Sequence, residues 1–240
     1  MLGLRQPRAR SLWSYNPIPG GCELYIPAFH NSIRGPVFKS VDPFGHIGAV
    51  SGATKVNKGF FFDALDDEIS VPDAPSITDI FSGGGTILAW INPASDGEAA
   101  NGRILDKQAL NKGYDFRVAE QSGSDVKLGF FKYFDGVDGF WRTSSVEITI
   151  NQWTLVAIAY DSGSADNNPL MYVNGLSVTV AEIATPTGTA QSDSGEDITI
   201  GAKFDNSETW DGLIGECWMY NRILTPAEIT YIHQRTRGRY

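Results

Sequence analysis

Residues 210–229 read WDGLIGECWMYNRILTPAEI, and they combine a long strand pattern with the start of a helix. Leu213–Tyr220 is dominated by apolar and aromatic residues, which is typical of a β-strand. Thr225 and Glu228 have the spacing of a capping box, with Pro226 at the first helical position. The spacing therefore predicts a short helix over residues 226–234, directly after the last strand.

Strand patterns also fill most of the chain before this segment. Thr86–Ile91 is β-rich, and Trp153–Tyr160 is apolar on both faces, as expected for the central strand of a covered sheet. Asn174-Gly175 separates two apolar runs and predicts a hairpin, because both turn positions need positive φ. Further strands are expected at residues 69–71, 103–105, 114–118, 126–130, 145–150, 170–173, 176–180 and 198–200. Many short strands with one short helix predict an all-β fold, an antiparallel β-sandwich.

A series of motifs then narrows the fold. In chain order these are Gly59–Ile69, Thr86–Pro93, Asn151–Ala157, Leu170–Gly175 and Tyr220–Ile229. They resemble the G-x-x-F-D-G-x-D-D-x-I, T-I-x-A-W-I-x-P, N-x-W-x-x-V-A, L-x-Y-V-N-G and Y-N-R-A-L-S-x-E-E-I motifs of laminin-G-like, concanavalin-A-like jelly rolls. The resemblance covers about residues 45–234 and is to members of the type seen in viral (phage) and metagenomic proteins. It implies a two-sheet jelly roll, a fold that hosts many unrelated functions.

Two details of this resemblance bear on the structure. It implies a first strand near residues 22–27, with Leu24–Ile26 close to Gly215–Met219 of the last strand. Ala64 stands where the motif has glycine, which argues against a positive-φ turn at that position.

Charge divides the chain into basic ends and an acidic body. The net charge is -9, which argues against nucleic-acid binding through phosphates by the body. We predict an N-terminal arm, residues 1–20, a jelly-roll domain, residues 21–234 with a linker at 28–47, and a basic tail, residues 235–240. The arm is Pro-rich and is expected to dock on an acidic surface of a partner, the alternative being that both ends are solvated tails. Its candidate contact residues are Arg5, Arg8, Arg10 and Trp13.

The compartment is predicted from the start of the chain and from its cysteines. Residues 1–8 lack the apolar core of a signal peptide, so we expect the protein to stay in the cell or to leave within an assembly. No apolar run approaches the roughly 18 residues of a membrane span. Cys22 and Cys217 are expected to be reduced, the alternative being a disulfide between the first and last strands.

The sequence contains no recognisable catalytic constellation. The E-x-D-x-x-E string of glycosidases with this sandwich is absent. The nearest acidic pairs, Glu120 with Asp125 and Glu208 with Asp211, have the wrong spacing. None of His30, His46 and His233 lies in an expected strand. We therefore predict that the protein is not an enzyme, with a polysaccharide-active enzyme as the less favoured alternative.

Oxygen-rich loops are the candidate metal sites, and no other cofactor is predicted. Asp205, Glu208 and Asp211 precede the last strand and are the candidate calcium ligands. Asp63–Asp67 and Asp161–Asn168 are two further loops of this kind. The alternative is that these side chains bind local backbone in turns. A double calcium site of the pentraxin type is not expected, because Ala202-Lys203-Phe204 replaces its acidic cluster.

The candidate ligand platform is the aromatic run at residues 130–142. Tyr133, Phe140, Trp141 and Arg142 are its candidate ligand-binding residues, because exposed rings stack on sugars or on a partner. The alternative is core packing, since a sandwich buries alternate residues. In this interpretation Trp141 is exposed, and Trp153, which opens an apolar strand, is buried.

Two functions from different classes remain open on these grounds. The first is a structural component of a virion, such as a phage capsid decoration or tail protein, assembled in the host cytoplasm and bound to other virion subunits. The second is a carbohydrate-binding module or lectin of a cell-surface or secreted protein. The two are compatible, because a decoration protein can also bind glycans.

Overall fold

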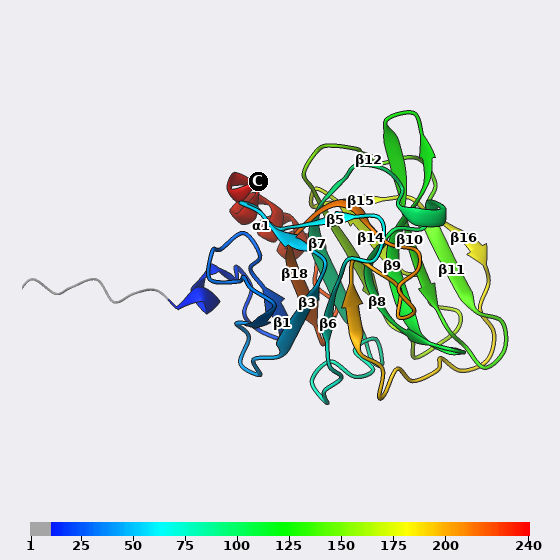
Figure 1. Ribbon diagram of the computed structural model, residues 1–240. Helices are drawn as coiled ribbons and strands as arrows, with labels where there is room; N and C mark the ends of the chain where they lie inside the picture. The colour runs from blue at the N-terminus through cyan, green and yellow to red at the C-terminus, as the bar shows by residue number, and fades with distance from the viewer. Residues whose placement is uncertain (1–10) are drawn as a thin grey trace, which may run out of the picture.

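The structure, a computed structural model that describes residues 11–240, contains two antiparallel β-sheets packed face to face (Figure 1). The first sheet runs in the order β15 (Leu176–Val178), β14 (Leu170–Val173), β13 (Thr154–Tyr160), β7 (Gly85–Pro93), β18 (Asp211–Tyr220), β5 (Phe60–Asp63) and β4 (Thr54–Lys55), with β1 (Cys22–Ile26) also paired to β18. The second sheet runs in the order β16 (Val180–Ala184), β11 (Gly139–Thr143), β10 (Asp125–Lys132), β9 (Lys112–Ser122), β8 (Arg103–Ala109), β17 (Ile198–Ile200), β6 (Glu68–Val71), β3 (Ile47–Ser51) and β2 (Val37–Lys39), with β12 (Ile148–Thr149) paired to β10. The predicted all-β jelly-roll sandwich is confirmed.

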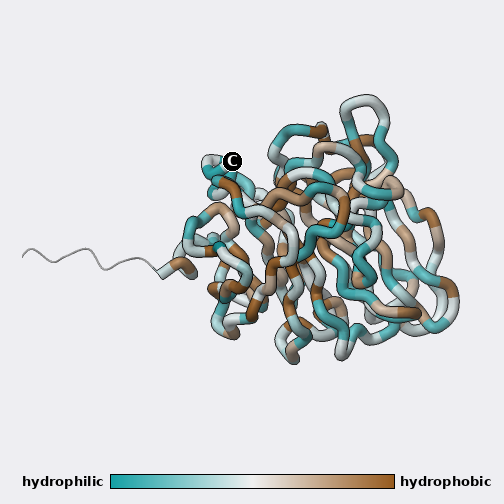
Figure 2. Tube along the Cα trace, viewed as in Figure 1, coloured by the Kyte–Doolittle hydropathy of each residue, from teal (hydrophilic) through white to brown (hydrophobic). Residues whose placement is uncertain are grey.

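The main hydrophobic core lies between the two sheets. Successive side chains of a strand point to opposite faces, so each strand of the second sheet sends every other residue inward. On β9 the inward residues are Tyr114, Phe116 and Val118, and all three are buried. Figure 2 shows the result along the chain, where hydrophobic segments (brown) alternate with hydrophilic ones (teal).

A second cluster covers the outer face of the first sheet. Strand β7 directs Ile87 into the main core and Leu88 and Trp90 into this second cluster, where Ile229 and Ile232 of α1 (Pro226–Thr236) meet them. This double coverage explains why the central strands of the first sheet are apolar on both faces. The remaining short helices are η1 (Leu12–Tyr15), η2 (Glu98–Ala100) and η3 (Arg237–Arg239). In residues 11–240 no helix is long and apolar enough to cross a membrane.

Local signals at the start of α1 and at the hairpin are confirmed. Thr225 Oγ1 accepts a hydrogen bond from the Glu228 backbone N–H at 3.2 Å, and the Glu228 carboxylate accepts one from the Thr225 backbone N–H at 2.9 Å. The helix continues to Thr236, two residues past its predicted end. Asn174 and Gly175 form the β14–β15 turn with φ of 51° and 80°. The turn at Ala64 departs from expectation: its φ is 64°, so alanine occupies the left-handed conformation without the motif glycine.

The first and last strands are neighbours, as the resemblance implies. Leu24 lies opposite Met219 and Ile26 lies opposite Cys217, whereas Cys22 lies opposite Tyr220. Cys22 and Cys217 are therefore about 10 Å apart along the strand direction, beyond the reach of a disulfide. Both thiols are free and buried, so the alternative of a disulfide between the first and last strands is wrong. Burial raises the pKa of the Cys217 thiol to about 12.

Three segments differ from the predicted organisation because each finds a partner in the fold. Residues 28–47 are more than a linker, since they contain β2 and the first residue of β3. Trp13, expected in the partner-binding arm, packs edge-on against Tyr25 of β1 at 6.1 Å between ring centroids. Arg5, Arg8 and Arg10 of the arm lie outside the described residues. The expected tail also packs, because Tyr240 stacks on Trp90 of β7 with ring centroids 4.6 Å apart.

Candidate functional site on the outer face of the second sheet

A row of polar and aromatic residues crosses the outer face of the second sheet, the face turned away from the main core. The strand register sets one residue of each of six adjacent strands side by side, namely Ser70, Thr199, Asp106, Asp115, Phe131 and Phe140. Their strand neighbours, such as Phe116 and Phe130, lie in the main core, so the row faces outward. The row brings carboxylates, hydroxyls and aromatic rings onto one face.

Two carboxylates at the centre of the row belong to a buried charged network. Arg103 Nε lies 3.3 Å from Asp106 Oδ2, and Arg103 Nη1 lies 3.4 Å from Asp115 Oδ1. Arg117 Nη2 donates to Asp115 Oδ2 at 2.6 Å. All four side chains are buried. Burial, followed by repulsion from Asp115, raises the pKa of Asp106 to about 8.

Aromatic rings enclose the arginine end of this network. The Arg117 guanidinium carbon lies 5.7 Å from the Phe131 centroid and 5.1 Å from the Phe140 centroid, and that of Arg142 lies 5.2 Å from Phe140. Tyr133 packs edge-on against Phe131 at 4.8 Å. Burial, followed by repulsion from Arg117, lowers the pKa of Arg142. Three predicted ligand-binding residues, Tyr133, Phe140 and Arg142, are therefore partly exposed on one patch.

Trp141, the fourth predicted ligand-binding residue, is not on this patch. It is 0 % exposed and lies in the main core, and its Nε1 reaches the core boundary, where it donates to Oδ1 of the exposed Asn168 at 2.6 Å. Trp153 shows the opposite error, because it is only partly buried, against Tyr240. The assignment of Trp141 to the surface and Trp153 to the core was wrong. The period of two along β11, with Phe140 and Arg142 on one face, was the signal that places Trp141 inward.

A hollow of about 340 Å³ opens on the same face beside the row. Its lining includes Glu68, Ser70, Gln108, Asp197, Thr199 and Phe204. The Phe204 ring is 40 % exposed, and burial raises the pKa of Glu68. The Gln108 amide donates to Asp115 Oδ2 at 2.6 Å, which connects the hollow to the charged network. Sequence reasoning missed this hollow, since its residues come from separate strands and loops with no common spacing.

The loop that carries Phe204 is tied to β8 and held together by an ion pair of its own. An ion pair joins Arg103 of β8 to Glu208, and Lys203 Nζ lies 3.6 Å from Glu208 Oε1. The loop starts at Gly201, with a φ of 90°, where a Cβ atom would meet the Phe62 ring at 2.1 Å. Only glycine fits there, so the loop leaves β17 in a fixed direction.

The predicted calcium ligands Asp205, Glu208 and Asp211 do not form one cluster. Asp205 Oδ2 and Glu208 Oε1 face Lys203 at 3.5 and 3.6 Å, and Asp211 Oδ2 accepts from Ser95 Oγ at 2.7 Å. These carboxylates already have a cation or a hydroxyl as partner. The structure therefore does not support a calcium site at residues 205–211.

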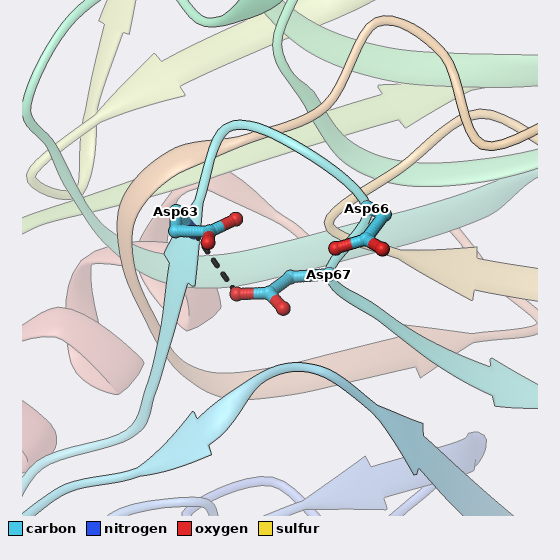
Figure 3. Close-up of side chains that lie close together, drawn as sticks. All are labelled: Asp63, Asp66 and Asp67. Atoms are coloured by element: carbon cyan, nitrogen blue, oxygen red, sulfur yellow. Dashed lines mark hydrogen bonds between the residues drawn. The ribbon is translucent and has the colours of Figure 1, made fainter.

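Asp63, Asp66 and Asp67 do converge, at the turn between β5 and β6 (Figure 3). Within residues 11–240 they are the one group of three such side chains whose ligand atoms lie within 4.8 Å of one another. Asp67 Oδ2 accepts a hydrogen bond from the Asp63 backbone N–H at 3.0 Å, the dashed line in Figure 3. Burial raises the pKa of Asp67. The contact is that of a side chain stabilising its own turn.

Known structures share this fold at low sequence identity. The binding domain of Paraclostridial Mosquitocidal Protein 1 is similar with a TM-score of 0.66 and 14 % identity, over 90 % of this chain and 52 % of that one. The binding domain of botulinum neurotoxin DC in complex with SialylT is similar with a TM-score of 0.61 and 13 % identity, over 90 % of this chain and 52 % of that one. Trypanosoma rangeli sialidase in complex with the inhibitor DANA is similar with a TM-score of 0.58 and 16 % identity, over 83 % of this chain and 31 % of that one.

These likenesses concern the fold alone. The chain spans about half the length of the toxin binding domains and about a third of the sialidase. A search of the curated proteins finds no match. A laminin-G-type family model, described as the "Concanavalin A-like lectin/glucanases superfamily", matches residues 63–230, which is more than half of the chain. The chain therefore belongs to the concanavalin A-like lectin/glucanase superfamily.

Proposed function

We propose that the protein is a non-enzymatic carbohydrate-binding protein that takes a neutral sugar in the hollow beside Phe204. The observation that carries the proposal is the composition of that hollow, an exposed aromatic ring next to hydroxyl, amide and carboxylate groups on one sheet face. Small-ligand sites combine an apolar surface with a few placed polar groups. A sugar ring presents an apolar C–H face and a rim of hydroxyls, which suits this combination.

The charges in the hollow favour a neutral sugar over an acidic one. Glu68, Glu196 and Asp197 all line it, and no basic residue does. Carboxylates accept hydrogen bonds from sugar hydroxyls, while they repel an anionic ligand. Ser70 and Thr199 add hydroxyls on the adjacent strands β6 and β17.

The state of the central carboxylates supports binding rather than hydrolysis. Glycoside hydrolases place two accessible carboxyl groups on either side of the scissile bond. Here Asp106 and Asp115 are 0 % exposed and are held by Arg103 and Arg117. A substrate therefore cannot reach this pair of carboxyl groups in the folded protein.

Phe204→Ala tests the site against a matched control. We expect the wild-type protein to retain neutral oligosaccharides on a glycan array, and Phe204→Ala to weaken the best one about tenfold, equivalent to about 1.4 kcal/mol. Phe61→Ala removes an equally exposed ring, also 40 %, from β5 in the first sheet. It should bind as wild type in titration calorimetry. Equal affinity of the two variants, or an array without neutral ligands, contradicts the proposal.

A virion role, with a location in the particle rather than at a cell surface, is the second candidate. One surface feature favours a protein partner: Val37, Phe44 and Ile47 are 57 %, 54 % and 48 % exposed near β2, the edge strand of the second sheet. A mainly apolar hollow of about 620 Å³ lies at Phe44 and Ile47. Contiguous exposed apolar surface marks interaction sites, and an edge strand has unpaired backbone groups. The partner would be another virion subunit, as expected for a phage decoration or tail protein.

This role predicts that tagged protein sediments with virus particles from the cells that make it. Phe44→Ser combined with Ile47→Ser should abolish co-sedimentation and leave the melting temperature within a few degrees, because both side chains are exposed. Leu110→Ser, which changes an 82 % exposed leucine at another edge of the molecule, is the control. Failure of the wild-type protein to sediment with particles would contradict the virion role.

A further inference from the structure

Another pocket, of about 400 Å³, lies between the end of α1 and the outer face of the first sheet, on the side of the sandwich opposite to the hollow beside Phe204. Its lining includes Gln152, Trp153, Asn174, His233, Arg237 and Tyr240. The hollow beside Phe204 lies on the second sheet, so the two sites share no residue. Whatever binds here binds independently of the proposed neutral-sugar site.

The aromatic wall of this pocket is held in place. Tyr240 stacks on Trp90 at 4.6 Å with 21° between the ring planes, and Trp153 lies 4.6 Å from Tyr240. Trp90 Nε1 donates to Thr236 Oγ1 at 2.9 Å, which fixes the buried end of the stack. Trp153 and Tyr240 are only partly buried and line the pocket. Rings already ordered cost little entropy when a ligand stacks on them.

The charged side chain that lines this pocket is an arginine, although the protein is acidic. The chain carries a net charge of -9, yet no Asp or Glu lines the pocket. Arg237 is exposed and forms no ion pair within residues 11–240, whereas Arg222 and Arg239 pair with Glu228 and Glu216. An unpaired guanidinium beside an aromatic wall is suited to a carboxylate, which it can bind through two hydrogen bonds.

Neutral hydrogen-bonding groups complete the lining. Asn174 Oδ1 accepts from the Leu155 backbone N–H at 3.1 Å, which leaves its Nδ2 hydrogens for a ligand. Gln152 is exposed and forms no side-chain hydrogen bond within residues 11–240. Burial, followed by repulsion from Arg237, lowers the pKa of His233, so its ring is a neutral donor and acceptor at physiological pH.

We propose that this pocket binds the carboxylate-bearing ring of an acidic sugar, a hexuronate unit. The C–H face of the sugar stacks on Trp153 and Tyr240, and its carboxylate pairs with Arg237. Its hydroxyls meet the amides of Gln152 and Asn174. A neutral sugar would leave the guanidinium without a partner, and an aliphatic acid would leave the ring wall uncovered.

Two probes that differ only in the carboxylate test this proposal on the full chain. Methyl β-glucuronide should bind at least about tenfold more tightly than methyl β-glucoside in saturation-transfer NMR titrations. The preference should decrease as NaCl rises, because exposed charges are screened. Equal affinity for the two probes, or no binding of the glucuronide, overturns the proposal.

The variants separate the pocket from general electrostatics and from the other site. Arg237→Gln should lower glucuronide affinity to that of the glucoside, whereas Arg235→Gln, an exposed arginine two residues earlier that does not line the pocket, should not change it. Phe204→Ala should leave glucuronide binding intact, so the two proposals fail separately. If Arg235→Gln loses as much affinity as Arg237→Gln, the attraction is non-specific and the pocket is not a site.

Discussion

Trp141→Ala is expected to lower the free energy of unfolding by about 3–5 kcal/mol. Its indole ring is fully buried between the sheets, 5.9 Å from the Phe130 ring and 5.4 Å from Tyr160. Truncation leaves a cavity that the surrounding strands cannot close. The loss is a large share of the roughly 5–15 kcal/mol by which a domain is usually stable. Urea denaturation monitored by circular dichroism measures it.

Trp153→Ala is the matched comparison, since it removes the same side chain from a partly exposed position. Trp153 packs mainly on Tyr240 at the edge of the second cluster, so its loss should cost about 1–2 kcal/mol. Trp141→Phe should recover much of the stability, because it keeps an aromatic ring in the core. A larger loss for Trp153→Ala than for Trp141→Ala would contradict this placement of the two side chains.

Arg239→Met is expected to cost about 3–5 kcal/mol, because it leaves a buried carboxylate without its cation. Glu216 of β18 is 0 % exposed and pairs with Arg239. The Tyr25 hydroxyl donates a hydrogen bond to Glu216 Oε1 at 2.6 Å. Burial raises the pKa of Glu216 to about 7, and Arg239 is the main group that opposes this rise. Removal of Arg239 should therefore raise that pKa further.

Arg239 also joins the two ends of the described chain. Its guanidinium lies 4.7 Å from the Phe29 ring centroid and 5.5 Å from that of Tyr15, and Nη2 donates to the Tyr15 carbonyl at 2.8 Å. The region predicted as a basic tail is thus a clamp that holds residues near the N-terminus against the first sheet. Met keeps the side-chain length, so the loss reports mainly on the charge and its hydrogen bonds.

The effect of Arg239→Met should depend on pH in a direction set by Glu216. A carboxyl group whose pKa is higher in the folded protein than in the unfolded chain stabilises the fold less as pH rises from about 4.5 through the folded pKa. In the variant the pKa of Glu216 is higher still, so the free energy of unfolding keeps falling to a higher pH. The stability lost through Arg239→Met should therefore be greater at pH 8 than at pH 5. Glu216→Gln in the variant background should restore part of the stability. An equal cost at both pH values, or an equal effect of Arg235→Met, would contradict the clamp.

The order of elements could be predicted because its signals are local. The capping box of α1 and the Asn174-Gly175 turn each depend on residues within four positions, so neighbouring sequence specifies them. The apolar run of β13 likewise indicates a covered strand without knowledge of its partners. Trp141 shows the limit of local signals, since its aromatic neighbours indicate a surface platform while the alternation along β11 places its side chain inward.

By itself, the sequence determined an all-β sandwich of this superfamily and its closing helix, because caps, turns and strand periods act over short stretches. Only the tertiary structure decided which side chains meet. The row from Ser70 to Phe140 draws on six strands, and the contact between Tyr25 and Glu216 joins residues 191 positions apart. Such contacts follow from strand order and register, which depend on how whole sheets bury their apolar faces and are not written in any one segment.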